Sequence, residues 1–169
     1  GGWDNGRWGV IDKHGNWLAD PIFADIDCEY HDGLFAFYES DKWGDDVPLG
    51  IYDVREKKVL FQPQFFAVSF RDDGWIEVKV YDEQLGRRVE KLIDRTGKEK
   101  FHSIYTSIYC WKKPYEVMIR DKKGDRHGLI DEDGNVILPC EYDVAWSGID
   151  YEHKRIVFKE NEKFGVKDF

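Results

Sequence analysis

Several features that define other protein classes are scarce or absent in this chain. Its 169 residues include 3 cysteines, 5 prolines and 1 methionine. No apolar run reaches the roughly 18 residues that a membrane-spanning helix needs, and the chain does not open with a basic leader that carries an apolar core. The sequence therefore argues against a helical membrane protein and against a small domain held by disulfides. We expect no membrane span.

The few cysteines bear on the cellular compartment. Their number is odd, with Cys28, Cys110 and Cys140, and the chain is long enough to fold without covalent staples, which favours free thiols in a reducing environment. We expect a cytoplasmic location, although an extracellular or periplasmic one stays open because a signal peptide can be removed. The first residues are Gly1-Gly2 and the methionine is Met118, so we expect a processed, excised or engineered chain.

Basic residues are also in deficit. The chain has 25 Lys and Arg against 34 Asp and Glu, for a formal net charge of -9. Nucleic acid would be repelled on average, and the densest basic segments, 86–91 and 120–126, are interleaved with acidic residues. We therefore expect no nucleic acid partner. An acidic surface instead complements a basic protein.

What the chain does contain is a repeated start. The stretch Gly6-Arg-Trp-Gly-Val-Ile-Asp-Lys-His-Gly15 returns in altered form at 49–56, 90–97 and 126–134, and a fifth start lies at 164–169. Such self-similarity predicts a tandem repeat. We expect one repeat domain over 1–169, divided approximately into repeat 1 (6–42), repeat 2 (43–84), repeat 3 (85–123), repeat 4 (124–163) and a partial fifth start (164–169).

Each start places an apolar residue two positions before an aspartate; these are Asp12, Asp53, Asp94, Asp131 and Asp168. In three starts the aspartate opens the pattern Asp-x-x-Gly, at 12–15, 94–97 and 131–134. There the carboxylate can accept a hydrogen bond from the backbone two residues on, while the glycine takes a left-handed conformation. The pattern predicts a β-hairpin. No such glycine follows Asp53, so its turn must differ.

One aromatic residue follows each turn at an equivalent position: Phe23, Phe65, Tyr105 and Tyr142. A large aromatic at constant depth is what a stacked core needs, because each ring buries a large area against its neighbours. Three of these residues follow a proline, namely Pro21, Pro63 and Pro139. Proline breaks a strand or holds it at the edge of a sheet.

Each repeat ends in a further extended run. At 75–81, for example, Ile76, Val78 and Val80 alternate with Glu77 and Lys79, which predicts one buried and one solvated face. Each repeat would then hold about three short antiparallel strands and could not bury its apolar face alone. We predict an all-β fold of about four β-meander repeats stacked as an open superhelix or solenoid-like array. The alternative is a closed propeller-like ring.

Three segments of the first repeat carry a family resemblance: Arg7-Trp-Gly-Val-Ile-Asp-Lys-His-Gly15, Pro21-Ile-Phe23 and Gly33-Leu-Phe-Ala36. Together they resemble the WG (KWG) β-repeat family of bacterial proteins. The resemblance covers nearly the whole chain and is best in repeats 1 and 4, whereas Leu49-Gly50 and Glu90-Lys91 stand where the family has Trp-Gly. It implies an all-β tandem-repeat scaffold with no shared catalytic residues.

The sequence itself offers little catalytic chemistry. Among its 5 histidines, His14 falls inside a hairpin turn and His127 occupies the tryptophan position of its repeat. Paired carboxylates such as Asp72-Asp73 also fall in expected turns. We find no nucleophile elbow and no phosphate-binding loop. We therefore expect a protein that is not an enzyme, and we assign no catalytic, cofactor-binding or metal-binding residues.

The 7 tryptophans are a stronger signal. We place Trp8 in the repeat core. Trp43 lies in the longest irregular segment, 39–48, which is either tolerated length variation or a projecting loop of the kind that often binds. Exposed tryptophan is enriched in interface hot spots and can also stack on sugars. Our candidate partner-binding residues are Trp43, Trp111, Trp146, Asp45 and Asp46.

These observations favour a non-catalytic protein-interaction scaffold. Its partner would be a basic protein, and a bacterial immunity or effector-associated module is a specific version of this expectation. The alternative is binding of carbohydrate or cell-envelope glycan through the exposed tryptophans.

Overall fold

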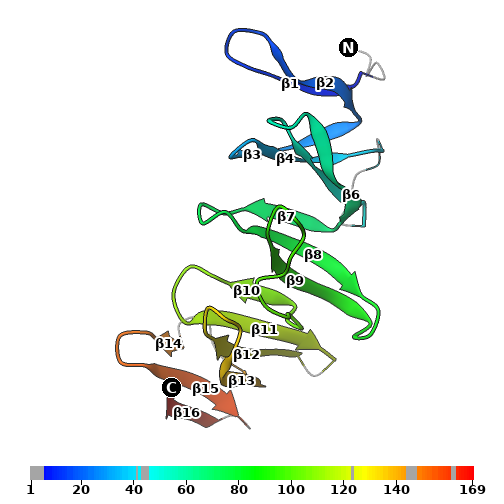
Figure 1. Ribbon diagram of the computed structural model, residues 1–169. Coiled ribbons are helices and arrows are strands. Elements are labelled where there is room, and N and C mark those ends of the chain that lie inside the picture. The colour runs from blue at the N-terminus through cyan, green and yellow to red at the C-terminus, as the bar shows by residue number, and fades with distance from the viewer. Residues whose placement is uncertain (1–5, 41, 43–45, 123, 144–147, 161–162) are drawn as a thin grey trace. The chain divides into compact units, whose positions relative to one another are not determined.

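The structure, a computed structural model, describes residues 6–40, 42, 46–122, 124–143, 148–160 and 163–169. Over these residues the chain is all β, with strands β1 to β16 and no helix (Figure 1). None of the described segments is therefore a helix long and apolar enough to cross a membrane. The all-β prediction is confirmed.

The strands form open antiparallel sheets whose members follow one another along the chain. The first sheet pairs β1 (Trp8–Ile11) with β2 (Trp17–Phe23). The second has the order β3 (Asp25–His31), β4 (Leu34–Tyr38), β5 (Leu49–Asp53), β6 (Lys58–Phe65). The third has β7 (Ala67–Phe70), β8 (Ile76–Asp82), β9 (Arg87–Ile93). The fourth has β10 (Ser107–Tyr109), β11 (Tyr115–Asp121), β12 (Gly124–Ile130), β13 (Val136–Tyr142), and the fifth β14 (Ile149–Asp150), β15 (Arg155–Glu160), β16 (Lys163–Asp168).

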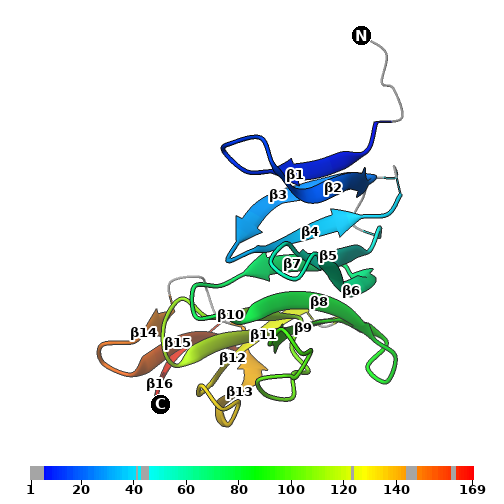
Figure 2. The same ribbon diagram turned by 45° about the horizontal axis from the view of Figure 1, so that its top comes forward.

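The boundaries of the sheets do not coincide with the boundaries of the sequence repeats. Repeats 1, 2 and 4 each contribute four strands, not the three that we predicted. The first two strands of a repeat join the last two of the repeat before it, so that β5 and β6 continue the sheet of β3 and β4 (Figure 2). In the same way β12 and β13 continue the sheet of β10 and β11. Because every sheet after the first combines strands from two successive repeats or repeat starts, backbone hydrogen bonds link one to the next.

The aspartate turns form as the sequence predicts. Asp12 Oδ1 accepts hydrogen bonds from the backbone N–H of His14 at 2.7 Å and of Asn16 at 2.9 Å, and Gly15 has a φ of 85°. Equivalent bonds form at Asp94 and Asp131. The turn after Asp53 differs, since there the left-handed residue is Lys57, with a φ of 51°.

The repeated aromatic residues also occupy equivalent places. Phe23 ends β2 opposite Trp8, Phe65 ends β6 opposite Leu49, and Tyr142 ends β13 opposite His127. Repeat 3 has no strand between Ile93 and Ser107, yet the Glu90 N–H still donates to the Tyr105 carbonyl at 2.9 Å. Each aromatic therefore closes the hairpin that its repeat start opens.

The chain packs as two compact units, the first formed by Gly1–Tyr81 with Leu92–Lys98 and the second by Asp82–Lys91 with Glu99–Phe169. In the first unit the Phe23 ring lies 5.2 Å from Phe35, 4.8 Å from Phe37 and 5.2 Å from Tyr52, between ring centroids. Each such aromatic pair contributes about 0.5–1.5 kcal/mol beyond the area that it buries. Tyr52 belongs to repeat 2, so this core again joins neighbouring repeats.

A second core of the first unit is shared by three repeats. It contains Leu34 from repeat 1, Ile93 from repeat 3, and Ile51, Phe65, Phe70, Ile76 and Val78 from repeat 2. In the second unit Leu129, Leu138 and Ile156 form a buried cluster against which Tyr142 and Phe158 pack. Both cores of the first unit thus combine residues of neighbouring repeats, as the sequence-based interpretation expects, whereas the three buried residues of this second-unit cluster all belong to repeat 4.

Two further expectations had different outcomes. The prolines Pro21, Pro63 and Pro139 lie in β2, β6 and β13, each an edge strand of its sheet, as the missing N–H requires. Trp8, which we placed in the core, is 59% exposed. Its residue pairs with Phe23 through the backbone, but it is the Phe23 ring that packs inside.

An ion-pair cluster of the first unit joins repeats 1, 2 and 3. Asp53 is 2% exposed, and its Oδ2 accepts a hydrogen bond from Arg95 Nη1 at 2.7 Å. The other end of the same guanidinium donates to the Asp32 carbonyl at 2.6 Å. Asp32 also pairs with Arg55, and this hydrogen bond, more than any other contact, holds the pKa of Asp32 below its usual value.

Candidate functional site

The structure places the sequence-predicted binding residues unevenly. Trp43, Asp45 and Trp146 lie outside the described residues. Asp46 is exposed. Trp111 is 83% exposed and lines a cleft of the second compact unit. The described residues form several hollows, and the two with the most apolar linings lie one in each compact unit.

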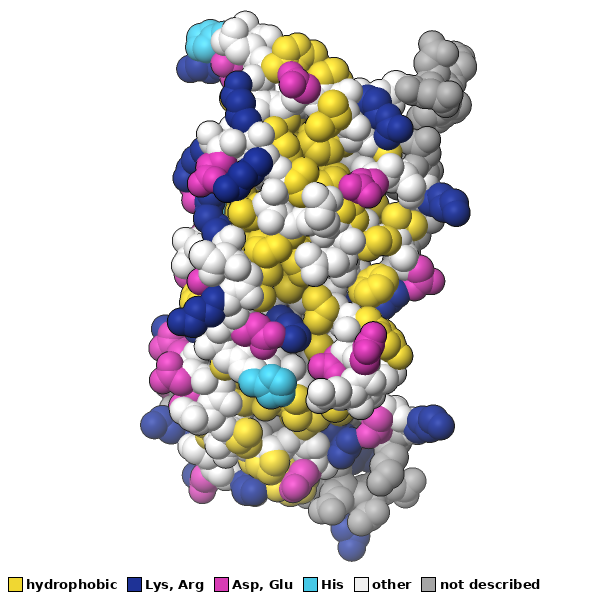
Figure 3. All heavy atoms as spheres, turned by 45° about the vertical axis from the view of Figure 1, so that its right-hand side comes forward, with side chains coloured by type: hydrophobic (Ala, Val, Ile, Leu, Met, Phe, Trp, Pro, Cys, Tyr) yellow, Lys and Arg dark blue, Asp and Glu magenta, His cyan; other side chains and the backbone are white. Residues whose placement is uncertain are grey.

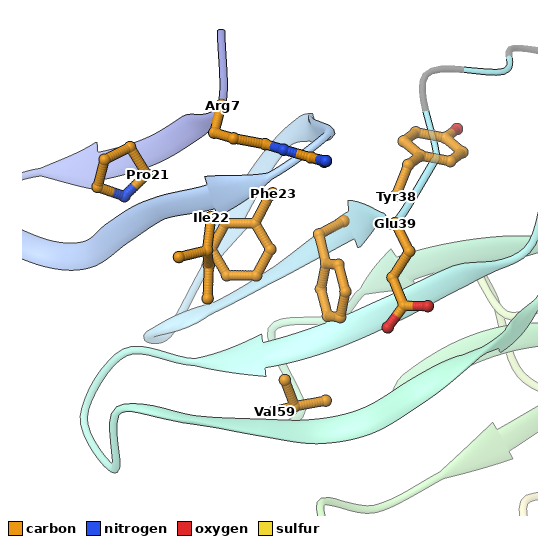
Figure 4. Close-up of a pocket in the computed structure, with 8 residues that line it drawn as sticks. Arg7, Pro21, Ile22, Phe23, Tyr38, Glu39 and Val59 are labelled. Atoms are coloured by element: carbon orange, nitrogen blue, oxygen red, sulfur yellow. The ribbon is translucent and has the colours of Figure 1, made fainter. Parts of the chain in front are cut away.

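The hollow of the first unit is a groove of about 560 Å³ beside β2, β4 and β6. Its apolar lining includes Ile22, Phe23 and Val59. Figure 4 shows Tyr38 and Glu39 across from Ile22 and Phe23, with the Arg7 side chain extended above Phe23. The groove is thus mainly apolar, with one charge of each sign among its lining residues.

Large hydrophobic side chains are exposed elsewhere on this unit as well. Trp8, Trp17 and Ile22 are each more than half exposed. Figure 3 shows hydrophobic side chains gathered in a strip over the upper part of the molecule, among charged ones. Exposed apolar surface of this kind is typical of a protein that contacts a partner, but it fixes no ligand chemistry.

The cleft of the second unit has a more definite composition. It measures about 340 Å³ and is lined by Tyr109, Trp111, Lys112, Glu116, His127, Ile149 and Tyr151. We call it the Trp111 cleft. The sheet β10 to β13 supplies Tyr109, Glu116 and His127, the loop after β10 supplies Trp111 and Lys112, and β14 with the following turn supplies Ile149 and Tyr151. Its volume lies at the small end of the range for ligand pockets.

One wall of the cleft is aromatic. The rings of Tyr109 and Trp111 stack with their centroids 6.2 Å apart and their planes 12° from parallel. Trp111 is nevertheless 83% exposed, so most of the indole remains open to an incoming group. An aromatic ring that is held flat and left uncovered gives a binding partner a large contact area at small entropic cost.

The polar groups of the cleft come from neighbouring strands. Glu116 lies opposite Tyr109 in the register of β10 and β11. Its Oε1 is 2.8 Å from Nδ1 of His127 on β12, and both side chains are mostly buried. Burial and, second, the Glu116 carboxylate raise the pKa of Tyr151. Glu116 thus presents negative charge beside a phenol that stays neutral at physiological pH.

A positive charge lies above the same phenol ring. Lys112 Nζ is 5.3 Å from the centroid of Tyr151, within the range of a cation–π contact. The next residue, Lys113, pairs instead with Glu132, at 2.5 Å between Nζ and Oε1. The cleft therefore holds one internal cation, carried on an exposed lysine of the loop.

Metal ligands do not gather in the described part of the chain. No cluster of three or more His, Cys, Asp or Glu side chains could hold a metal ion there. The structure has no disulfide at Cys110 or Cys140, while the side chain of Cys28 lies outside the described set. Burial raises the pKa of Cys140 to about 11, which keeps this thiol in its unreactive protonated form.

Sequence reasoning found Trp111 but missed its neighbours. Nothing in the sequence places the β14 turn, which carries Tyr151, beside the strands that carry Tyr109 and Glu116. One signal was present: His127 stands where repeat 1 has Trp8. A polar residue at a position that is tryptophan in repeat 1 indicates a different local environment in repeat 4.

Comparisons with known proteins bear on the repeats. The family model of the WG containing repeat matches residues 8–43 and 128–164. No curated protein and no solved structure matches the chain. The matched stretches fall in repeats 1 and 4, the two repeats whose sequences carry the resemblance most clearly. These two stretches belong to the family of WG containing repeats, as their sequence predicts.

Proposed function

We propose that the protein is a non-catalytic interaction scaffold that holds a protein partner at the Trp111 cleft. The observation that carries this proposal is the stacked, uncovered Trp111 ring beside a hydrogen-bonded acidic group. Tryptophan and tyrosine dominate binding energy at protein interfaces, particularly when they surround a pocket that a partner side chain can fill. The repeats supply the rigid support.

Charge supports a basic partner. The chain carries a formal net charge of -9, and such a charge accelerates encounter with a basic protein and repels acidic competitors. A specific version of the proposal is a bacterial immunity or effector-associated protein that neutralises a basic toxin. The cytoplasm is the location that we propose for this encounter, since free thiols suit a reducing compartment.

Photo-crosslinking from inside the cleft tests the proposal. A photoreactive phenylalanine analogue is placed at position 111 and, as a matched control, at position 17, where Trp17 is also exposed but belongs to the other compact unit. We expect a cross-linked protein at position 111 that is absent at position 17, and direct binding by that protein once purified. Equal cross-linking at both positions, or none at 111, contradicts the proposal.

A second candidate function is binding of a glycan. The observation that favours it is the combination of an open indole face with the Glu116 carboxylate and His127 in the same cleft, because sugars stack on aromatic rings while their hydroxyls take hydrogen bonds. Titration with a panel of cell-envelope glycans, followed by tryptophan fluorescence, separates the two functions. A protein binder leaves the fluorescence unchanged, whereas a saturable change that Trp111→Ala abolishes favours the glycan.

A further inference from the structure

We infer that the Trp111 cleft takes a basic side chain, the guanidinium of an arginine or the ammonium of a lysine, from the protein partner. This inference rests on the proposed function and adds the chemistry of the group that enters. It follows from three features of the cleft: its aromatic rings, the Glu116 carboxylate and the cation that it already holds.

Aromatic rings bind cations through their negative faces, and Trp and Tyr are well suited to this contact. The cleft brings together Tyr109, Trp111 and Tyr151. Trp111 is stacked on Tyr109 and open on its other side. Tyr151 has already accepted a cation on its face. A flat guanidinium stacks on such rings particularly well.

The carboxylate of Glu116 supplies the opposite charge. The side chain of Glu116 is 23% exposed and that of its partner His127 is 12% exposed, so the carboxylate is partly withdrawn from water. One of its oxygens, Oε1, contacts His127, and a carboxylate has acceptor sites on both oxygens. A charged donor that enters the cleft can therefore make a charge-assisted hydrogen bond, which is stronger than a neutral one.

Lys112 is the internal occupant of this site. Its ammonium lies over the Tyr151 ring on an exposed loop residue, whereas the neighbouring Lys113 is held by Glu132. The free protein thus fills the cation position with its own side chain. A partner's arginine or lysine displaces Lys112, so the lysine lowers affinity for every basic ligand without forming part of the binding contact.

The test uses short peptides and NMR of the isotope-labelled chain. The probes are Gly-Gly-Arg-Gly-Gly, the same peptide with citrulline, which is the neutral isostere of arginine, and the same peptide with glutamate. Binding is followed at the indole N–H resonance of Trp111, identified by its loss in Trp111→Phe. We expect a saturable shift with the arginine peptide, and none with the citrulline or glutamate peptide at equal concentration.

Three variants sharpen the test. Glu116→Gln should weaken arginine-peptide binding about tenfold, the effect of removing one charged hydrogen-bond partner. Glu141→Gln, an exposed acid on β13 outside the cleft, should leave binding unchanged. Lys112→Met should strengthen binding about threefold, the size of an exposed cation–π contact.

Equal binding of the citrulline and arginine peptides overturns the inference, as does weaker binding in Lys112→Met or a glycan that shifts the Trp111 resonance when the arginine peptide does not. Failure here is distinct from failure of the proposed function. If a protein still cross-links at position 111 while the arginine peptide leaves the Trp111 resonance unchanged, that result supports the interaction scaffold and contradicts the binding of a basic side chain.

Discussion

Arg95 Nη1 donates a hydrogen bond to Oδ2 of the buried Asp53 across 2.7 Å, and this contact links the third repeat start to the second. Oδ1 of the same carboxylate accepts the backbone N–H groups of Arg55 and Glu56. The aspartate that shapes its own turn thus also anchors the arginine of the next start. Asp53 therefore stabilises its own turn and also joins repeat 2 to repeat 3.

Arg95→Met should destabilise the protein by about 3 kcal/mol, since removal of one partner of a buried ion pair leaves the other charge uncompensated. The side chain of Arg95 is 34% exposed, which places the effect at the lower end for such pairs. Chemical denaturation measures the change. Arg55→Met, which removes an exposed pair with Asp32, is the control and should cost less than about 1 kcal/mol.

The same cluster allows a double substitution. Asp53→Asn keeps a side-chain oxygen for the turn but removes the buried charge, so Asp53→Asn together with Arg95→Met should be more stable than Arg95→Met alone. If the double variant is less stable than the single one, the buried charge is not the source of the loss.

The glycine of a repeat start leaves room for neighbouring groups, as Gly50 shows in repeat 2. A Cβ at this position would lie 2.5 Å from Cζ of Phe37 on the preceding strand and 2.9 Å from the carbonyl oxygen of Phe61 on the following one. Gly50→Ala should therefore cost about 1–3 kcal/mol, as overpacking of a filled core does. The measurement is the free energy of unfolding, with exposed Gln62→Ala on β6 as the control expected to stay within about 0.5 kcal/mol. Equal stability of the two variants would refute the packing role.

Stability should fall in acid because of the aspartate turns. Hydrogen bonds, first among them those from the side chains of Asn16, Thr96 and Asn135, lower the pKa of Asp12, Asp94 and Asp131 below the ordinary value of 3.8. A carboxyl whose pKa is lower in the folded state stabilises the fold fully above its unfolded pKa and loses that effect as the pH drops through the folded value. The free energy of unfolding should thus decline below about pH 4.

A matched pair of variants isolates this effect. Asp131→Asn should reduce the dependence of stability on pH in the acid range, whereas Asp133→Asn should not, since Asp133 joins that turn through its backbone N–H. Denaturant titrations at several acid pH values give the slopes. Identical slopes for the two variants would show that the turn carboxylates do not cause the acid sensitivity.

The thiol of Cys140 should resist alkylation. Burial raises its pKa from 9.0 to about 11, against the opposing effect of the Arg126 and Arg87 charges. With Cys28 and Cys110 replaced by serine, the rate of reaction with iodoacetamide should keep rising above pH 9, because the thiolate is the reactive form. A rate that levels off near pH 9 in the folded protein would contradict the raised pKa.

The repeat pattern allowed much of the fold to be predicted, because local chemistry fixes it. Asp12 and Gly15 define a turn through contacts with neighbouring residues alone. The aromatic at an equivalent position of each repeat, as at Phe23, Phe65 and Tyr105, predicts a buried ring. Which strands of neighbouring repeats share a sheet could not be predicted in the same way. Periodicity identifies a unit that recurs, but the sheet that β4 and β5 share crosses the boundary between two such units.

Neither the exposure of Trp8 nor the composition of the Trp111 cleft could be predicted from the sequence. The side chain that enters the core is set by the tertiary pairing of β1 with β2, in which Phe23 packs inward and Trp8 is left outside. The cleft depends on the approach of Ile149 and Tyr151 to Glu116, residues from different strands of the second compact unit. No local sequence pattern predicts that these residues lie close together.

The most direct test of binding at the Trp111 cleft is the affinity of the purified chain for the protein that cross-links at position 111. Trp111→Ala should weaken this affinity by about tenfold or more, as loss of a tryptophan hot spot does. Its melting temperature should stay within about 2 °C, because exposed substitutions change stability little. Trp17→Ala should bind as the unaltered chain does. Undiminished affinity in Trp111→Ala, or an equal loss in both variants, would show that the Trp111 cleft is not the binding site.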